Sequence, residues 1–254
     1  MRLQALEAGQ GRPLVLLHGL FGSARNWGGV QKALAAEYRV VALDLRNHGA
    51  SPHAPGMGYA VQAEDVAETL ATLRIENAAL LGHSMGGKVA MMLALTRPVL
   101  VEHLIVADIA PRSYPPVLRA TVGAMQAVPL HAGLTRQEAD QALRAAVPEA
   151  PIRKFLLQNL RFEATPPAWR IGLTEIAAAM PEIEDFAPPP GARFDGPALA
   201  MAGALSPYIR AEDHAGFRAL FPRISFASIP CAGHWLHAEN TEGFVAALRE
   251  FLAA

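Results

Sequence analysis

The sequence predicts an α/β fold in which a mostly parallel central sheet is flanked by helices and interrupted once by a helical insertion. Apolar runs alternate with helical patterns over residues 1–111, and the same alternation resumes from residue 191 onward. Between them, residues 112–190 have helical patterns punctuated by proline, without convincing buried strands. Alternating strands and helices are typical of parallel sheets buried on both faces. We therefore expect a core of residues 1–111 and 191–254 and a helical cap of residues 112–190.

The first half of the core contains short apolar runs that are typical of strands covered on both faces. These predicted strands are residues 13–17, 38–45, 78–81 and 104–108. Helical periodicity falls between them, at residues 26–37, 61–73 and 87–95. The order strand, helix, strand is the one expected for a parallel sheet with crossover helices.

The insertion and the second half of the core follow the same reasoning. Thr135 and Glu138 form a capping box that predicts a helix start, and further helices are expected at residues 152–160 and 168–180. Consecutive prolines at 188–190 indicate a linker. Beyond it we expect strands at 197–202 and 224–229 and helices at 214–221 and 241–252.

Composition excludes several classes of protein. Hydrophobic residues make up 52% of the chain and charged residues 18%, which argues against disorder. A net charge of -1 gives no electrostatic basis for binding nucleic acid or an anionic membrane. Cys231 is the single cysteine, and the start of the chain lacks a signal-peptide pattern. We expect a cytoplasmic protein without a membrane or nucleic-acid partner, and no sequence signal indicates its oligomeric state.

The most informative motif is Gly82-His83-Ser84-Met85-Gly86, placed between a predicted strand and a predicted helix. In this context G-x-S-x-G is typical of a sharp turn that presents a serine hydroxyl above a sheet. The helix start behind it directs N–H groups at a developing negative charge. We interpret Ser84 as a nucleophile, in preference to an idle serine in a glycine-rich turn.

A serine nucleophile needs a base, and that base needs an acid to orient it. His234 follows the last predicted strand beside a glycine and is the expected base, although His237 lies three residues later. Asp108 ends the strand after the serine helix and is preferred as the acid. Asp213 is the alternative, although it falls inside a predicted helix.

Residues 18–22 follow the first predicted strand, where this kind of fold supplies part of an oxyanion hole. We expect the backbone N–H groups of Met85 and Leu20 to serve, with that of Phe21 as the alternative to Leu20. Four side chains are expected to touch the substrate: Phe21, Asn159, Trp169 and Trp235. A polar loop at residues 44–51 is interpreted as bracing backbone groups, with support of the oxyanion loop or substrate binding as the alternative.

Five stretches carry a family resemblance: LLHGLFGSARNW, DLRNHGASPH, LLGHSMGGKVAMMLAL, VADIAP and AGHWLHAE. Together they resemble the α/β-hydrolase fold, and within it the group of bacterial YbfF-type esterases and abhydrolase domain-containing protein 11. The resemblance covers nearly the whole chain and implies that Ser84, Asp108 and His234 match the catalytic serine, acid and histidine. The group reads G-G-N-S-P-Y where this chain has Leu205 at the third position, which removes a polar group from that loop.

These observations predict a serine esterase, without cofactor or metal, that acts on small-molecule esters with apolar acyl groups. Thioester, lactone or C–C bond hydrolysis could use the same residues, and a non-catalytic binding protein could use the same scaffold. A metal enzyme is disfavoured because His234 and His237 lack the glutamate of H-E-x-x-H. A dinucleotide enzyme is disfavoured because no G-x-G-x-x-G follows the first strand.

Overall fold

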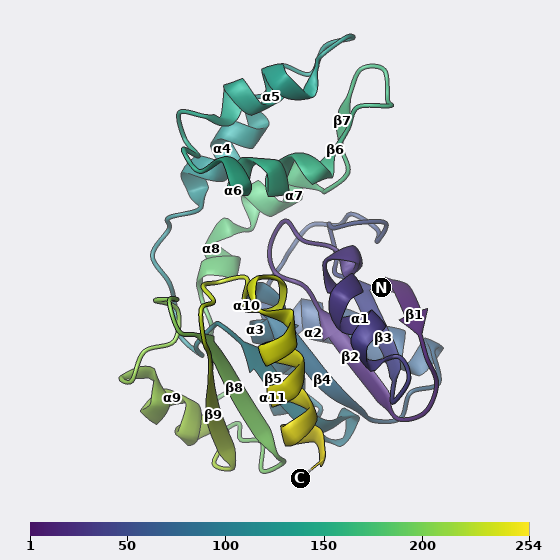
Figure 1. The fold of residues 1–254 in the computed structure, drawn as a ribbon, viewed down its shortest axis with the longest axis vertical. Coiled ribbons are helices and arrows are strands. Elements are labelled where there is room, and N and C mark those ends of the chain that lie inside the picture. Colours follow the sequence, from purple (N-terminus) through teal and green to yellow (C-terminus); the bar gives the residue numbers. More distant parts are fainter. Residues whose placement is uncertain (254) are drawn as a thin grey trace.

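The computed structural model describes residues 1–253, which are built around a seven-stranded sheet (Figure 1). Its strands, in spatial order, are β1 (Gln4–Ala8), β3 (Arg39–Asp44), β2 (Pro13–Leu17), β4 (Ala78–His83), β5 (Val101–Ala107), β8 (Ala198–Gly203) and β9 (Ile224–Ile229). Every neighbouring pair is parallel except β1 and β3. The predicted α/β fold with a mostly parallel sheet is therefore confirmed.

Strand β1 was not predicted, because most of its residues face solvent and form no apolar run. The sheet is covered by helices on both faces: α1 (Gly28–Leu34), α2 (Tyr59–Thr72), α3 (Met85–Thr96), α9 (Asp213–Leu220), α10 (Leu236–Glu239) and α11 (Thr241–Ala253). Short 3-10 turns are formed by Ala24–Trp27, Pro98–Leu100 and Leu157–Asn159. Among residues 1–253, no helix combines the length and the apolar character needed to cross a membrane.

The strands are buried on both faces because alternate residues enter two separate apolar cores. In β2, Leu14 and Leu16 pack with the side chains of α1 and α11. Val15 and Leu17 point to the other face and pack with α2, α3 and part of the insertion. The central strands therefore read as continuous apolar runs, as is expected for a parallel sheet between two helix layers.

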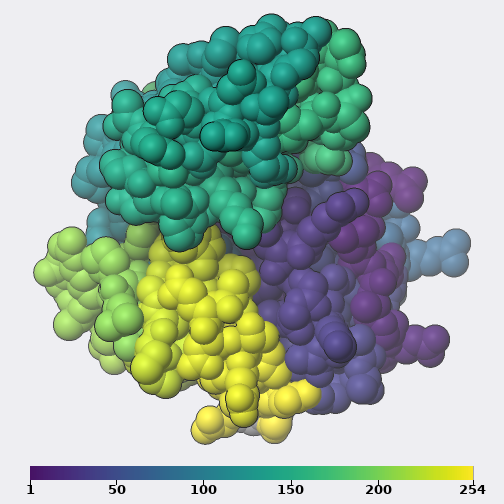
Figure 2. All heavy atoms as spheres, turned by 45° about the horizontal axis from the view of Figure 1, so that its top comes forward, coloured from purple at the N-terminus to yellow at the C-terminus, as the bar shows by residue number. Residues whose placement is uncertain are grey.

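Residues 112–190, called the insertion from here on, separate β5 from β8 and lie beyond one end of the sheet (Figure 1). It contains α4 (Arg119–Gln126), α5 (Arg136–Leu143), α6 (Ala150–Leu156), α7 (Leu173–Ala178), α8 (Met180–Glu184) and a small hairpin of β6 (Leu160–Arg161) and β7 (Ala168–Trp169). In the space-filling view, its teal and green atoms cover purple and yellow parts of the core (Figure 2).

One detail of the insertion differs from the sequence expectation and another agrees with it. The helix expected at 168–180 begins only at Leu173, because Ala168 and Trp169 pair with the preceding chain as β7. Prolines 166 and 167 precede this strand, and proline disfavours helical backbone in the residue before it. The capping box at Thr135 is confirmed: its hydroxyl accepts from Glu138 N at 3.2 Å, and its N–H donates to the Glu138 carboxylate at 2.8 Å.

The parallel strands end at one edge of the sheet, on the side where the insertion lies (Figure 1). The loops that follow these carboxyl ends are where open α/β sheets form their binding crevices. They carry Leu20 after β2, Ser84 after β4, Asp108 after β5 and His234 after β9. Residues far apart in the sequence are thereby brought to one place.

Candidate active site

Ser84 lies at the tip of a sharp turn between β4 and α3, with φ 52° and ψ -119°. Two glycines permit this turn. A Cβ atom at Gly82 would lie 2.0 Å from the Gly86 carbonyl oxygen, and one at Gly86 would lie 2.4 Å from the Leu17 carbonyl oxygen. A non-glycine residue with positive φ is strained, and such strain is often found at functional sites. The turn holds the Ser84 hydroxyl at the carboxyl edge of the sheet.

The structure brings Ser84, His234 and Asp108 together in one hydrogen-bonded chain. His234 Nε2 lies 3.1 Å from Ser84 Oγ, and His234 Nδ1 lies 2.7 Å from Asp108 Oδ2. These three residues are 150 and 126 positions apart in the sequence, so the chain exists only because of the fold. The distances suit proton transfer from the hydroxyl to the imidazole, with the carboxylate orienting the ring.

Asp108 is fully buried and accepts two further hydrogen bonds besides the one from His234. Gly203 N donates to Asp108 Oδ1 at 3.1 Å, and the Ser206 hydroxyl donates to Oδ2. Sequence reasoning did not find Ser206, because the apolar Leu205 beside it removed the expected polar character of this loop. The presence of a serine at position 206 could have indicated this hydrogen bond, since the loop after β8 lies at the same edge of the sheet as Asp108.

Asp213, the alternative acid, has other hydrogen-bond partners. Its Oδ1 accepts from Arg112 Nε at 2.7 Å and its Oδ2 accepts from Arg210 N at 2.9 Å. The geometry therefore favours Asp108 as the partner of His234. His237, the alternative base, packs against the Trp27 and His83 rings at 4.6 and 4.7 Å between centroids.

Two aromatic side chains contact His234, one at its backbone and one at its ring. His83 Nε2 lies 2.7 Å from the His234 carbonyl oxygen and donates to it, while the Tyr208 ring stacks on His234 at 3.9 Å. Burial holds the pKa of His83 well below its usual value. A neutral His83 keeps the proton on Nε2 that this hydrogen bond requires. His83 directly precedes Ser84, but the sequence did not reveal its partner.

Two backbone N–H groups beside Ser84 have no acceptor among residues 1–253: that of Leu20, in the loop after β2, and that of Met85, at the start of α3. The Phe21 N–H, considered as an alternative donor, is occupied: it donates to His48 Nε2 at 3.1 Å. His48 Nδ1 donates to the Arg46 carbonyl at 2.8 Å, which leaves Nε2 free to accept. Burial lowers the His48 pKa to about 3, so this ring stays neutral and keeps accepting.

The insertion holds the backbone of the same residue through its carbonyl group. Asn159 Nδ2 donates to the Phe21 carbonyl oxygen at 2.8 Å, and Asn159 is buried. Phe21 has φ 62°, an unfavourable value for a side chain of its size. The two hydrogen bonds therefore hold the peptide groups on both sides of a strained residue, next to the free Leu20 N–H.

The polar loop at residues 44–51 braces backbone groups, as interpreted from the sequence. Asp44 accepts from Ala24 N at 2.7 Å and from Ala50 N at 2.8 Å. His48 in addition accepts from Phe21 N, in the loop after β2. No residue of this loop lines either cavity described below.

Two cavities meet at Ser84, which lines both of them. The smaller has a volume of about 390 Å³ and the larger about 690 Å³. Of the predicted substrate contacts, Phe21 and Trp235 line the larger cavity, whereas Asn159 and Trp169 line neither. Asn159 instead holds the loop after β2 through the Phe21 carbonyl oxygen, as described above.

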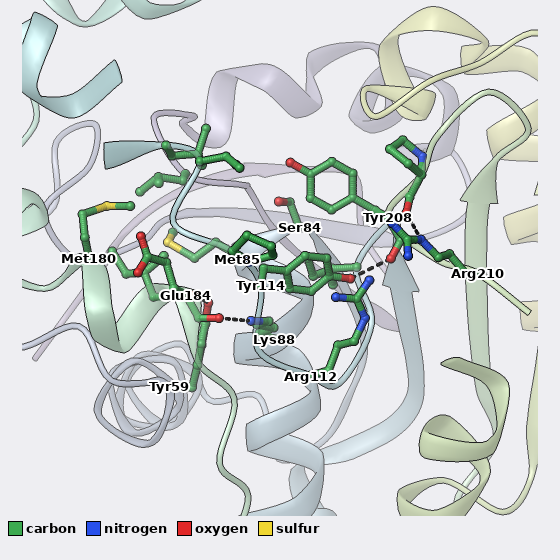
Figure 3. Close-up of a pocket in the computed structure, with 17 residues that line it drawn as sticks. Tyr59, Ser84, Met85, Lys88, Arg112, Tyr114, Met180, Glu184, Tyr208 and Arg210 are labelled. Atoms are coloured by element: carbon green, nitrogen blue, oxygen red, sulfur yellow. Dashed lines mark hydrogen bonds between the residues drawn. The ribbon is translucent and has the colours of Figure 1, made fainter. Parts of the chain in front are cut away.

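Lys88 lies at the floor of the smaller cavity (Figure 3). Its Nζ donates to the carbonyl oxygens of Glu184 at 3.3 Å and Asp185 at 2.9 Å, and it lies 5.3 and 5.0 Å from the Tyr59 and Tyr114 ring centroids. Burial lowers the Lys88 pKa to about 8. Lys88 therefore links α3, which begins beside Ser84, to the end of α8 in the insertion.

No cluster of three or more potential metal ligands occurs among residues 1–253.

Known proteins resemble this chain over nearly all of its length. A family model described as "alpha/beta hydrolase fold" matches residues 12–241. The chain is 42% identical over 250 residues to "sn-1-specific diacylglycerol lipase ABHD11" of Xenopus laevis, covering 95% of this chain and 80% of that one. It is 34% identical over 241 residues to "Esterase YbfF" of Escherichia coli K12, covering 94% and 92%. A solved structure of a "Marine microorganism esterase" superposes with a TM-score of 0.94 at 35% identity, covering 98% and 99%.

Proposed function

The chain belongs to the α/β-hydrolase fold family, and on that premise we propose that it is a serine esterase that hydrolyses carboxylic esters with apolar acyl groups. The observation that carries this proposal is the hydrogen-bonded chain from Ser84 through His234 to Asp108. It lies at the carboxyl edge of the sheet, where two cavities meet. No cofactor is needed for this chemistry.

The first half of the reaction forms an acyl-enzyme. Ser84 Oγ attacks the ester carbonyl carbon while His234 Nε2 takes its proton, and Asp108 stabilises the imidazolium that results. The N–H groups of Leu20 and Met85 are proposed to hold the negative oxygen of the tetrahedral intermediate. The bond to the alcohol oxygen then breaks, and His234 gives that oxygen the proton.

The second half releases the acid. Water enters where the alcohol was, and His234 takes a proton from it as its oxygen attacks the acyl carbon. The bond to Ser84 Oγ breaks, and the proton returns to that oxygen. The net change is one ester and one water consumed, with one carboxylic acid and one alcohol formed.

We propose that residues 112–190 act as a cap that shapes both cavities. Met180 and Ile183 of the insertion line the smaller cavity, and Ile152 and Phe155 line the larger. These side chains favour apolar groups on the substrate. The Lys88 charge is engaged by two carbonyl oxygens and two aromatic rings, which is compatible with an uncharged acyl group.

Replacing Ser84 tests the proposal directly. Ser84→Ala is expected to lower the kcat for a p-nitrophenyl ester by at least about 10³-fold, because the nucleophile is removed. Ser228→Ala, at an exposed position on β9, is the matched control and should retain full activity. A fluorophosphonate should label Ser84, as read by mass spectrometry of peptides. Equal rates for wild type and Ser84→Ala reject the esterase. Failure to label Ser84 favours a binding protein on the same scaffold.

A further inference from the structure

The two cavities that meet at Ser84 allow the two parts of the substrate to be assigned. We infer that the alcohol part of the ester occupies the larger cavity and the acyl part the smaller one. The preferred substrates are then esters of a bulky apolar alcohol with a shorter acyl chain. This inference rests on the proposed function and deepens it.

An ester bound at Ser84 extends in two directions from its carbonyl carbon, one for the acyl part and one for the alcohol part. The structure has one cavity in each of two directions from Ser84. Four residues line both cavities: Leu20, Ser84, Leu118 and Tyr208. They surround the place where the carbonyl carbon would be attacked. Each remaining lining residue belongs to one cavity only, so the chemistry on each side can be compared.

The position of His234 decides which side takes the alcohol. His234 lines the larger cavity and not the smaller one. Its Nε2 must give a proton to the alcohol oxygen as the ester bond breaks, so that oxygen must lie within hydrogen-bond reach of the ring. The alcohol therefore leaves into the larger cavity, where Trp235 and Phe155 pack against each other at 5.9 Å between ring centroids.

The acyl part is left with the smaller cavity. Met85, whose N–H is one of the two free donors, lines this cavity and not the other. Figure 3 shows Met85 and Met180 on one side of it and Lys88 below Ser84, one turn further along α3. Tyr59, Lys88 and Ile183 line this cavity and are buried. The Tyr59 hydroxyl donates to the Ile183 carbonyl oxygen and Lys88 Nζ donates to the Glu184 carbonyl oxygen, so the acyl chain meets packed side chains on this side.

The two cavity volumes predict the relative sizes of the acyl and alcohol parts of the substrate. The acyl side offers about 390 Å³ and the alcohol side about 690 Å³. Activity should therefore fall with increasing acyl length sooner than with increasing size of the alcohol. Extra methylene groups on the acyl chain would have to displace packed side chains at the inner end of the smaller cavity, which costs binding free energy.

A pair of equivalent substitutions tests the assignment. Ile183→Trp narrows the smaller cavity and Ile152→Trp narrows the larger one. The rates of acylation and deacylation are measured by stopped flow with acetyl and octanoyl p-nitrophenyl esters. Hydrolysis of acetate esters of methanol and 1-naphthol is measured in addition. Thermal unfolding verifies that each variant is folded.

Ile183→Trp should lower kcat/KM for the octanoyl ester at least about tenfold relative to the acetyl ester. It should change deacylation as well, because the acyl chain is still bound in that step. Ile152→Trp should lower kcat/KM for the naphthyl ester at least about tenfold relative to the methyl ester. It should leave deacylation unchanged, because the alcohol has already departed.

The reverse pattern, with Ile152→Trp acting on acyl length and on deacylation, overturns the assignment. If Ile183→Trp does not fold, Val117→Trp serves in its place, since Val117 is 68% exposed and also lines the smaller cavity. Wild-type hydrolysis that does not depend on Ser84 overturns the proposed function itself. Hydrolysis that depends on Ser84 with reversed selectivity overturns only the assignment.

Discussion

The N–H groups of Met85 and Leu20, proposed as the oxyanion hole, are positioned by two different kinds of contact. Met85 follows Ser84 directly, and its place is set by the turn between β4 and α3, which Gly82 and Gly86 make possible. The position of the Leu20 N–H depends on the backbone of the neighbouring Phe21. The N–H of Phe21 is held by His48 and its carbonyl by Asn159, which lie 27 and 138 residues away in the sequence.

One donor is therefore fixed by a local motif and the other by distant parts of the fold. A local motif places Met85 and the nucleophile together, so damage to it should affect both. The two hydrogen bonds to the Phe21 backbone come from two independent segments of the chain. A substitution that removes one of these hydrogen bonds leaves the other in place. The comparison predicts a graded set of effects.

The largest effect is expected for Gly82→Ala. The new Cβ would lie 2.0 Å from the Gly86 carbonyl oxygen, so the turn must open and displace both Ser84 and the Met85 N–H. We expect kcat to fall at least about 10³-fold, more than for the loss of one oxyanion donor. Steady-state kinetics with a p-nitrophenyl ester measure this. Gly216→Ala is the control, because nothing lies within 4 Å of a Cβ there. Activity of Gly82→Ala within tenfold of wild type would show that the turn does not need this glycine.

A smaller effect is expected for His48→Ala. This change leaves the Phe21 N–H without its acceptor and loosens the loop that positions Leu20. We expect kcat to fall about 10²-fold with little change in KM, since the loop serves the transition state. His131→Ala, at an exposed histidine of the insertion, is the control. A rise in KM at constant kcat would instead indicate a role in substrate binding.

The smallest effect is expected for Asn159→Ala. The Phe21 carbonyl loses its partner from the insertion, but His48 still holds the N–H of the same residue. We expect about a tenfold loss in kcat, and Lys154→Ala on α6 should have none. The double variant with His48→Ala should show coupling between the two losses, because both side chains hold the backbone of one residue, Phe21. Purely additive losses would mean that the two side chains act on separate features.

The same distinction explains what the sequence could predict. Ser84 was identified because strand, glycine, serine and helix lie within one short stretch. The strand at 13–17 was predicted with the observed bounds, since buried parallel strands read as apolar runs. The predicted bounds of the strand at 224–229 also agree, although only its two end residues are buried. His234 and Asp108 were identified from their places after strands, since the topology brings those ends together.

Features that rest on long-range contacts were missed. The hydrogen bond from Ser206 to Asp108 joins residues 98 positions apart, and that from Asn159 to Phe21 joins residues 138 positions apart. Asn159 was interpreted as a substrate contact because nothing in the sequence shows which surface it faces. Strand β1 was missed because pairing with β3 stabilises it, while its own pattern is largely exposed.

The buried histidines beneath the site have a consequence for how the protein tolerates acid. Burial lowers the pKa of His18 to about 4, of His48 to about 3 and of His237 to about 4. In the unfolded chain these rings regain an ordinary pKa near 6.5. Below that pH the unfolded state binds protons at these rings, whereas the folded state does not, so protonation favours unfolding. Each ring then costs about 1.4 kcal/mol of folding free energy per pH unit until its own folded pKa is reached. Packing that keeps the loops around Ser84 in place at neutral pH thus makes the whole fold vulnerable in acidic surroundings.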